Sequence, residues 1–432
     1  MASPSPPRLI IGLDYGTTFS GISVSRPWAD PSAVQLIQKW PSDYLRYRHS
    51  CKTPSRIAFP EDNPELAQND LRWGYQVAPT MIAASWTKLL LADTGPPIGD
   101  KDLKWAISLG LSHLPRGRSW AQVITAYLHM LYRHLRAFLR DKMAIDSEGW
   151  GRCLDSIQME VWLTVPAAWS EISRADVRHA ALEAGFGSRT ADQLCLLTEP
   201  EAALMATLHG RLENGSAVTI EPGECVVICD CGGGSVDIAS YFITSRDPLQ
   251  YHELVPSTGE FIGSTSIDRA FCRFLSEQWG DSFMQAPRHL VAPGSFLMKW
   301  FEGLKYGYSG TPGDYVHRQR LLGLDIALSR KDLYSMFEPV VSRVCELLIT
   351  HLEEARNAIN QPGIRAKVFL VGGFSESRYL RQEVTEMLDR KRHITVNTLK
   401  DPLASSNRSW GWPLGPPRFT PGHEKNTVKL GR

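Results

Sequence analysis

Two glycine turns are the features of this sequence best suited to chemistry. Asp14-Tyr-Gly-Thr-Thr18 in the first half of the chain returns as Asp230-Cys-Gly-Gly-Gly234 in the second half. Glycine lets the backbone N–H groups of such a turn approach a ligand closely, so each turn can cradle phosphate oxygens. The carboxylate that opens each turn, Asp14 or Asp230, can hold a hydrated Mg²⁺ ion against the same phosphates.

The segments around the two turns predict one structural unit that occurs twice. Leu9–Leu13 and Val226–Cys229 are apolar runs typical of buried strands, and Phe19–Val24 and Val236–Tyr241 are the expected returning strands. One hairpin at the start of each half predicts a duplicated fold that clamps a nucleotide between two lobes. The expected boundaries are 8–222 for the first lobe, 223–400 for the second lobe and 401–432 for an irregular tail rich in proline.

The rest of the chain predicts strands and helices in the order of an α/β protein. A strand at 159–166 stops at Pro166, and a helix follows with Ser170 at its start and Gly185 at its end. Ser119 is suited to cap the long amphipathic segment at 119–143. Helices are expected at 119–143, 170–185, from 199, 264–278, 295–308, 331–359 and 377–388, and strands at 34–39, 56–59, 195–198 and 367–373.

Composition and charge restrict the class of protein. The chain has 432 residues, of which 43% are hydrophobic and 22% charged, and its formal net charge is +1. It has no basic stripe that would predict nucleic-acid binding, no apolar stretch of about 20 residues that would predict a membrane span, and no apolar signal core, so a soluble cytoplasmic protein is expected. The eight cysteines are scattered and predict reduced core thiols, because no pair of ligands accompanies Cys229 and Cys231 at metal-site spacing.

Five motifs in order resemble the nucleotide-binding domain of the 70 kDa heat-shock protein (DnaK-type) family, within the actin-like (ribonuclease H-like) ATPase superfamily. The glycine motifs and the tryptophan-rich text around Trp73 and Trp86 are most similar to the divergent twelve-type branch of that family. The resemblance runs from residue 8 to about residue 390. Its motifs are Ile11–Ser20, Thr164–Trp169, Thr198–Ala203, Cys229–Asp237 and Leu370–Ser375, with a looser sixth at Phe301–Ser309.

The resemblance implies a role for individual residues around Mg²⁺ and ATP or ADP. Asp14 and Asp230 would hold Mg²⁺ through waters, Glu199 would position the attacking water, and Lys88 would reach the γ-phosphate. The β- and γ-phosphates would contact Gly16, Thr17, Thr18 and Phe19 from one lobe and Gly232, Gly233, Gly234 and Ser235 from the other. The nucleoside would lie against Gly372 and Gly373 and contact Glu302, Lys305, Ser309 and Phe374.

Simpler interpretations remain open for several of these residues. Lys88 also fits an exposed helix lysine, and Glu199 beside a proline also fits an ordinary helix start. The turn Gly372-Gly373 also fits a plain strand-to-helix connection. Asp237 either faces the site or pairs with a neighbouring strand, and it ranks below Asp230 as a candidate.

The sequence also departs from the family pattern. Phe374 and Glu376 stand where the family has a small hydroxyl residue and an arginine, and Tyr306 stands where an arginine commonly faces the base. Phe374 can stack on adenine instead, whereas Glu376 cannot supply a guanidinium plane. The helix that closes the second lobe in the family is expected to be missing or replaced after about residue 388, and no substrate-binding domain is expected.

Three functions follow from these patterns. The first is a chaperone-like ATPase that hydrolyses ATP to ADP with Mg²⁺ in a cleft between two lobes. The second is a nucleotide-dependent protein-binding module with weak or lost catalysis, which the departures near the base favour. The third is a small-molecule kinase of the same superfold, for which the sequence shows no acceptor-pocket motif. The expected partners are a nucleotide and an unidentified protein, with neither nucleic acid nor membrane.

Overall fold

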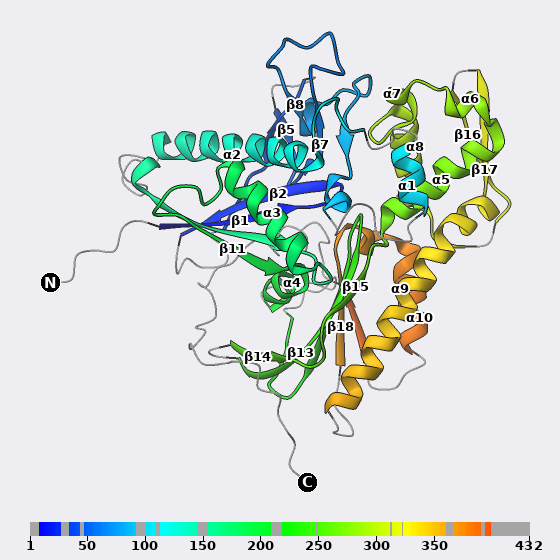
Figure 1. The fold of residues 1–432 in the computed structure, drawn as a ribbon. Coiled ribbons are helices and arrows are strands. Elements are labelled where there is room, and N and C mark those ends of the chain that lie inside the picture. Colours follow the sequence, from blue (N-terminus) through cyan, green and yellow to red (C-terminus); the bar gives the residue numbers. More distant parts are fainter. Residues whose placement is uncertain are drawn as a thin grey trace.

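Two six-stranded sheets form the centre of the molecule (Figure 1). The computed structural model describes residues 8–26, 34–43, 47–91, 101–108, 113–145, 154–208, 218–246, 249–311, 313–321, 323–359, 366–389 and 394–398. The predicted tail at 401–432 lies outside these described residues. The first sheet contains β1 (Arg8–Tyr15), β2 (Phe19–Ser25), β3 (Gln35–Leu36), β6 (Thr53–Pro54), β10 (Gln158–Val165) and β11 (Gln193–Thr198). The second contains β12 (Cys225–Cys231), β13 (Val236–Arg246), β14 (Leu249–Glu253), β15 (Thr258–Glu260), β18 (Ala366–Val371) and β19 (Ile394–Thr398).

Strand order and direction are the same in both sheets. The first sheet has the order β11-β10-β1-β2-β3, with β6 also pairing with β2. The second has the order β19-β18-β12-β13-β14, with β15 also pairing with β13. In each sheet the first hairpin and the strands beyond it are antiparallel, whereas the other two strands join in parallel. The mixed α/β architecture with a repeated hairpin therefore agrees with the sequence pattern.

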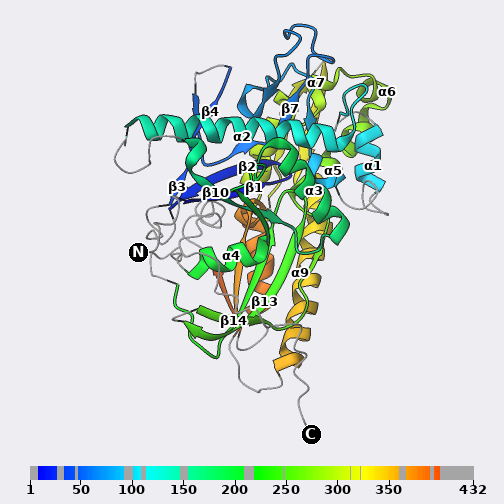
Figure 2. The same cartoon turned by 60° about the vertical axis from the view of Figure 1, so that its left-hand side comes forward.

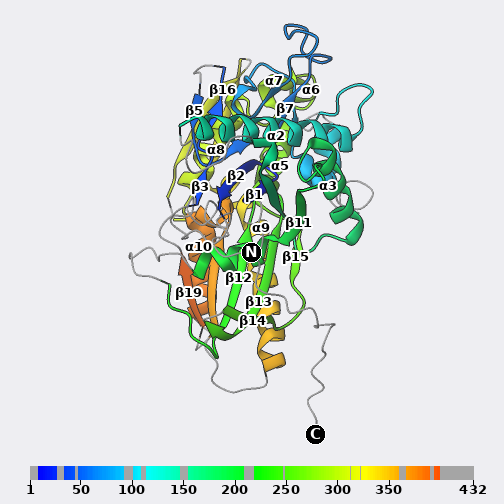
Figure 3. The same cartoon turned by 90° about the vertical axis from the view of Figure 1, so that its left-hand side faces the viewer.

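Helices cover these sheets and also lie between them. The helices α2 (Trp120–Ile145) and α3 (Glu171–Ala184) pack on the first sheet, and α9 (Arg330–Ile359) and α10 (Arg378–Asp389) flank the second. Figure 2 and Figure 3 show α2 above the first sheet and α9 running along the second. The short helix α4 (Glu199–Leu208) lies between the sheets, because its Ala202 packs against Ile10 whereas its Leu204 packs against Ile228. This position brings the first residue of α4 to the junction of the two sheets.

Local sequence explains where the helices begin and end. Ser170 caps α3 by accepting a hydrogen bond from the backbone N–H of Ser173 at 3.2 Å, and Gly185 ends it with a φ of 115°. Ser119 and Gln122 exchange reciprocal hydrogen bonds at the start of α2, in the pattern of a capping box. These caps confirm the predicted start of α2 and the predicted start and end of α3, since a short polar side chain or a glycine satisfies the backbone groups at each of these helix ends.

Several small elements were not predicted from the sequence. They include the helix α1 (Lys101–Ser108), the hairpin of β16 (Val316–Leu321) and β17 (Leu324–Ser329), and the pair β4 (Lys39–Pro41) and β5 (Tyr47–His49). The predicted strand at 56–59 is β7 (Arg56–Ala58), which forms a small sheet with β8 (Arg72–Trp73) and β9 (Ala84–Ser85). The predicted helices at 264–278 and 295–308 are α5 (Ser264–Trp279) and α8 (Phe296–Gly307), with the short helices α6 (Asp281–Met284) and α7 (Arg288–Val291) between them. None of the helices in the described ranges combines the length and apolar character that a membrane span requires.

Candidate functional site

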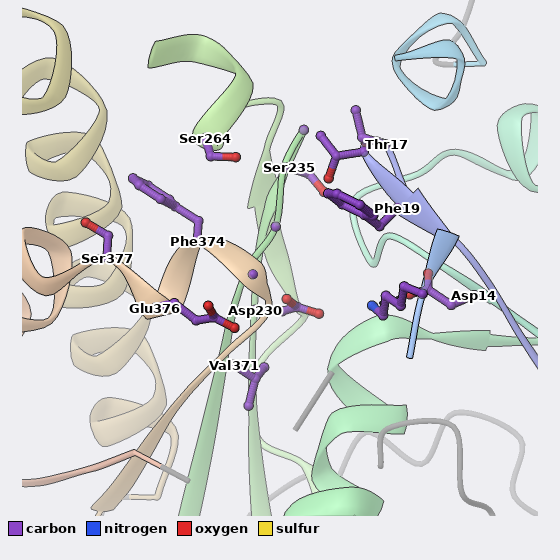
Figure 4. Close-up of a pocket in the computed structure, with 18 of the residues that line it drawn as sticks. Asp14, Thr17, Phe19, Asp230, Ser235, Ser264, Val371, Phe374, Glu376 and Ser377 are labelled. Atoms are coloured by element: carbon purple, nitrogen blue, oxygen red, sulfur yellow. The ribbon is translucent and has the colours of Figure 1, made fainter. Parts of the chain in front are cut away.

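A cavity of about 350 Å³ lies where the turns of the two sheets meet (Figure 4). Its walls come from the β1–β2 turn, the β12–β13 turn, the turn after β18 and the first residue of α4. The predicted residues that line it are Asp14, Gly16, Thr17, Thr18, Phe19, Lys88, Glu199, Asp230, Gly232, Gly233, Gly234, Ser235, Glu302, Lys305, Gly372, Gly373 and Phe374. Ser309 is the exception: it does not line the cavity, and its hydroxyl is hydrogen-bonded to that of Thr311.

The two glycine turns touch each other across this cavity. A Cβ atom added at Gly234 would lie 2.4 Å from Thr17 Oγ1, and one added at Gly233 would lie 2.8 Å from Thr18 Oγ1. Figure 4 shows Thr17 and Ser235 converging on this junction. Only glycine permits so close an approach, so the turns present backbone N–H groups and hydroxyls to one small volume. Such a volume suits phosphate oxygens.

The start of helix α5 fixes the second turn in place. The backbone N–H of Ser264 donates to the carbonyl of Gly232 at 3.3 Å, and that of Thr265 donates to the carbonyl of Gly233 at 2.8 Å. Ser264 itself lines the cavity. The turn is therefore held between strand β12 and the first residues of α5, with little freedom to move independently.

Several charged groups lie at the junction of the two sheets. They are the carboxylates of Asp14, Asp230, Glu199 and Asp237 and the ammonium groups of Lys52 and Lys88. Asp14 and Asp230 approach the cavity from opposite walls in Figure 4. Glu199 also lines it. Asp237 stands opposite Asp230 in the β12–β13 register, buried, with its Oδ1 accepting from the backbone N–H of Ala168 at 3.2 Å. Asp237 does not line the cavity, so the structure places it behind Asp230.

Burial and neighbouring negative charge raise the pKa of two of these carboxyl groups. Burial and the Glu199 and Asp237 carboxylates raise the pKa of Asp230 well above its ordinary value. Burial and the Glu199 carboxylate raise the pKa of Asp237 to about 7. A cation that enters this cluster would relieve the repulsion, so its chemistry suits a positively charged ligand.

Lys88 is one of the two ammonium groups in this cluster. It lies in the turn Thr87–Leu90, is buried, and forms an ion pair with Glu199. The hydroxyls of Tyr15 and Thr87 are 2.6 Å apart, which ties this turn to the end of β1. The interpretation of Lys88 as an exposed helix lysine is therefore wrong. Trp86, just before the turn, is the one non-glycine residue of the described chain with a positive φ, at 58°.

The other end of the cavity is built around the turn after β18. Gly372 has a φ of 82°, and a Cβ atom there would lie 2.3 Å from Asp230 Oδ1, so only glycine fits beside that carboxylate. Lys305 Nζ binds Asp268 at 2.7 Å and Glu302 at 2.6 Å. Phe374 is only 5% exposed and packs in the core, whereas Tyr306 is 56% exposed. Both aromatic side chains line the cavity.

Several lining residues were not predicted as site residues from the sequence, and the polar ones include Ser50, Lys52, Tyr75 and Ser264. Ser50, Lys52 and Tyr75 come from segments without glycine motifs, and only strand pairing brings them to the site. Ser264 begins a helix that was predicted, so a search of expected helix starts could have found it.

Comparison with known proteins adds an independent observation. No family model matches the chain. Heat shock 70 kDa protein 12A of Mus musculus is 22% identical over 476 residues, which cover 90% of this chain and 67% of the relative. Heat shock 70 kDa protein 12B of Homo sapiens is 23% identical over 480 residues, covering 88% and 65%. Chaperone protein DnaK of Stenotrophomonas maltophilia (strain R551-3) is 24% identical over 411 residues, covering 90% and 57%.

The chain is similar to members of the 70 kDa heat-shock protein family. The matches to proteins 12A and 12B confirm the predicted likeness to the twelve-type branch of the family. The chain spans about two thirds of the length of these two relatives and just over half of the DnaK relative. The family implies the actin-like ATPase fold, and the mixed α/β architecture with several sheets agrees with it.

The donor set of the cavity fits a hydrated divalent ion of the kind the heat-shock family implies. Asp14 and Asp230 both line the cavity, and burial together with the neighbouring Glu199 and Asp237 carboxylates raises the pKa of Asp230. Within the described ranges, no group of three or more His, Cys, Asp or Glu side chains has the arrangement of a direct metal site.

Proposed function

We propose that the chain binds ATP in this cavity and hydrolyses it to ADP as a chaperone-like ATPase. The contact between the two glycine turns carries the proposal, because Gly234 lies against Thr17 with no room for a side chain. Phosphoryl transfer needs positioning and charge neutralisation more than covalent chemistry. The two glycine turns would position the phosphates, and Asp14 and Asp230 would hold the cation that neutralises their charge.

Each group in the cavity has a proposed task. The backbone N–H groups and hydroxyls of Thr17, Thr18 and Ser235 hold the β- and γ-phosphates. Lys88 is a fixed positive charge close to the γ-phosphate, because Glu199 holds its ammonium group in place. Glu199 orients the attacking water through its remaining carboxylate oxygen. Asp14 and Asp230 would hold Mg²⁺ through water molecules, and the ion would neutralise the developing phosphate charge.

The two sheets are the proposed lobes, with boundaries at 8–222 and 223–400. The cavity takes its lining from both, so a nucleotide bound there would touch both hairpins at once. Hydrolysis would change these contacts and thereby the angle between the lobes, which is a familiar basis for a switch. Client proteins would then respond to that angle.

A nucleotide-dependent binding module with weak catalysis is the second candidate. The base end of the cavity favours it, because Tyr306 and Glu376 line the wall where the family has arginines. Tight ion pairing of Lys88 with Glu199 also favours it, since a paired carboxylate is a poorer partner for water. This candidate shares ATP binding with the first and differs only in turnover.

Calorimetry and phosphate release test the proposal together. We expect saturable ATP binding in the presence of Mg²⁺, and no binding at millimolar ATP would overturn both candidates. Asp14→Asn and Glu199→Gln should each reduce phosphate release at least about tenfold relative to wild type. The matched controls are Asp176→Asn and Glu171→Gln on the exposed face of α3, where the Glu171 side chain is 93% exposed.

The outcome separates the candidates. ATP binding with phosphate release that is equal in wild type, Asp14→Asn and Glu199→Gln would leave the binding module as the function. A phosphorylated acceptor appearing in a metabolite screen would support a small-molecule kinase instead.

A further inference from the structure

The ammonium group of Lys88 has an aromatic neighbour besides its ion-pair partner Glu199. Lys88 Nζ lies over the indole ring of Trp169, 5.6 Å from the ring centroid. The two residues are only 5% and 4% exposed, so little water screens the contact. An aromatic face attracts a cation within about 6 Å of its centroid, and tryptophan does so more strongly than tyrosine or phenylalanine. The pair is therefore a buried cation–π contact.

Hydrogen bonds on both sides hold the backbone of Trp169 in the connection between β10 and α3. Its backbone N–H donates to the Pro166 carbonyl at 3.3 Å, and its carbonyl accepts from Arg174 Nε at 3.1 Å. Arg174 also donates to the Ala167 carbonyl at 3.1 Å. The ring itself belongs to the apolar core of the first sheet. Trp169 is thus a fixed surface against which the flexible side chain of a lysine can rest.

The indole N–H of Trp169 is buried without an acceptor among the residues that the structure describes. An unpaired buried donor costs stability, and a phenylalanine at this position would avoid that cost. The face of tryptophan, however, attracts a cation more strongly than that of phenylalanine. The contact with Lys88 is a gain that can offset the unpaired donor.

Trp169 can act on a ligand only through Lys88, because Lys88 lines the cavity and Trp169 does not. The carboxylates of Glu199, Asp14 and Asp237 also attract the Lys88 ammonium group. The ring adds an attraction from another direction and accepts no conventional hydrogen bond. Since an ammonium group has three N–H donors and Glu199 accepts from it, donors remain for a phosphate oxygen.

We propose that Trp169 positions Lys88 against the γ-phosphate of bound ATP through this cation–π contact. The inference rests on the proposed function and names the group that holds its lysine in place. A weaker attraction by the ring would let the ammonium group move toward Glu199 and away from the γ-phosphate. ATP binding and phosphate release would then weaken, whereas ADP, which lacks that phosphate, would bind as before.

Fluorinated tryptophans test this role, because each added fluorine weakens the attraction of the ring for a cation with little change in size. Mono-, di- and trifluorotryptophan can be placed at position 169 by nonsense suppression. We expect single-turnover phosphate release to fall stepwise, by at least about fivefold for the trifluoro ring, and the affinity for ATP to fall at least about threefold. The affinity for ADP, also measured by calorimetry, should stay within about twofold of wild type. Trp169→Leu removes the aromatic face altogether and should slow release at least about tenfold.

Trp73 is the matched control for this series. It is also buried in the core of the first sheet, and its ring packs against Trp40, Tyr127 and His134. The same fluorinated rings at Trp73 should leave phosphate release and both affinities at the wild-type values.

The outcomes distinguish this inference from the function on which it rests. Phosphate release and ATP affinity that stay constant along the Trp169 series, while wild type hydrolyses ATP, would overturn the role of Trp169 and leave the ATPase intact. Equal weakening of ATP and ADP would overturn that role too, because the ring would then act on the structure of the whole site.

Failure of the proposed function gives a different result. Absence of phosphate release by wild type would overturn the proposed hydrolysis, and the ratio of the ADP and ATP dissociation constants along the series would then decide the role of Trp169. Absence of ATP binding by wild type would overturn both. Melting temperatures show whether Trp169→Leu fails to fold, in which case the fluorinated rings decide the question.

Discussion

The ammonium group of Lys88 pairs with the carboxylate of Glu199, a residue 111 positions further along the chain. Burial would lower the pKa of Lys88, but the nearby carboxylates of Glu199, Asp14 and Asp237 outweigh it and raise that pKa. Lys88 therefore stays protonated at every physiological pH. It is a permanent positive charge held at the first residue of α4, where the two sheets come together.

Removing this charge should affect both stability and turnover. Lys88→Met leaves the half-buried Glu199 carboxylate without its partner, and we expect a loss of about 2 kcal/mol in the free energy of unfolding. Phosphate release in a single turnover should fall below detection. Denaturant titration and single-turnover assays measure the two effects, with Lys331→Met at the exposed start of α9 as the control. Wild-type phosphate release by Lys88→Met would contradict the assigned role.

Separating the two glycine turns should weaken nucleotide binding. Gly234→Ala would place a methyl group 2.4 Å from Thr17 Oγ1 and 2.7 Å from Leu89 Cδ2, so the turns would have to move apart. We expect the affinity for ATP measured by calorimetry to fall more than about tenfold with the fold retained. Gly303→Ala in α8 meets no atom within 4 Å and should keep the affinity while stabilising the helix by up to about 1 kcal/mol. Equal affinities for the two variants would contradict this view of the junction.

Tyr306 should contribute to base binding and not to phosphate binding. Its ring is 56% exposed and lines the cavity, and base–aromatic stacking is worth about 1–3 kcal/mol. Tyr306→Ala should therefore weaken ATP at least about fivefold and leave inorganic tripolyphosphate unchanged. Tyr334→Ala, an exposed tyrosine of α9 outside the lining, is the matched control. Equal weakening of both ligands would show that Tyr306 acts on the structure of the site.

Asp237 should make stability depend on pH. Burial and the Glu199 carboxylate raise its pKa to about 7, while the unfolded chain titrates near 4. Between these values the folded protein keeps a proton that the unfolded chain has released, so stability falls as the pH rises. Asp237→Asn should reduce the loss of stability between pH 5 and pH 8 by at least about 1 kcal/mol.

Thermal denaturation at the two pH values checks this prediction. Asp176→Asn, at an exposed position of α3, should keep the wild-type pH dependence. An Asp237→Asn variant with the same pH dependence as wild type would show that this carboxyl group is already ionised at pH 5.

Much of the fold could be predicted from the sequence, because its signals are local. Continuous apolar runs predict the buried strands β1 and β12. The caps Ser119 and Ser170 and the glycine that ends α3 act on backbone groups a few residues away. The hairpin β16–β17 and the helix α1 were missed, because elements of six to eight residues are too short for a pattern of apolar residues to repeat more than a few times. The predicted role of Ser309 has no support in the structure, since its hydroxyl pairs with Thr311 away from the lining.

The sequence by itself determined the two Asp–Gly turns and the carboxylates that open them, since a turn needs only its own residues to adopt its shape. Tertiary structure alone decided which lysines form ion pairs with Asp14 and Glu199. Lys52 reaches Asp14 through the pairing of β6 with β2, and Lys88 reaches Glu199 across the junction of the sheets. Electrostatic partners depend on distance in space, and no spacing along the chain encodes that distance.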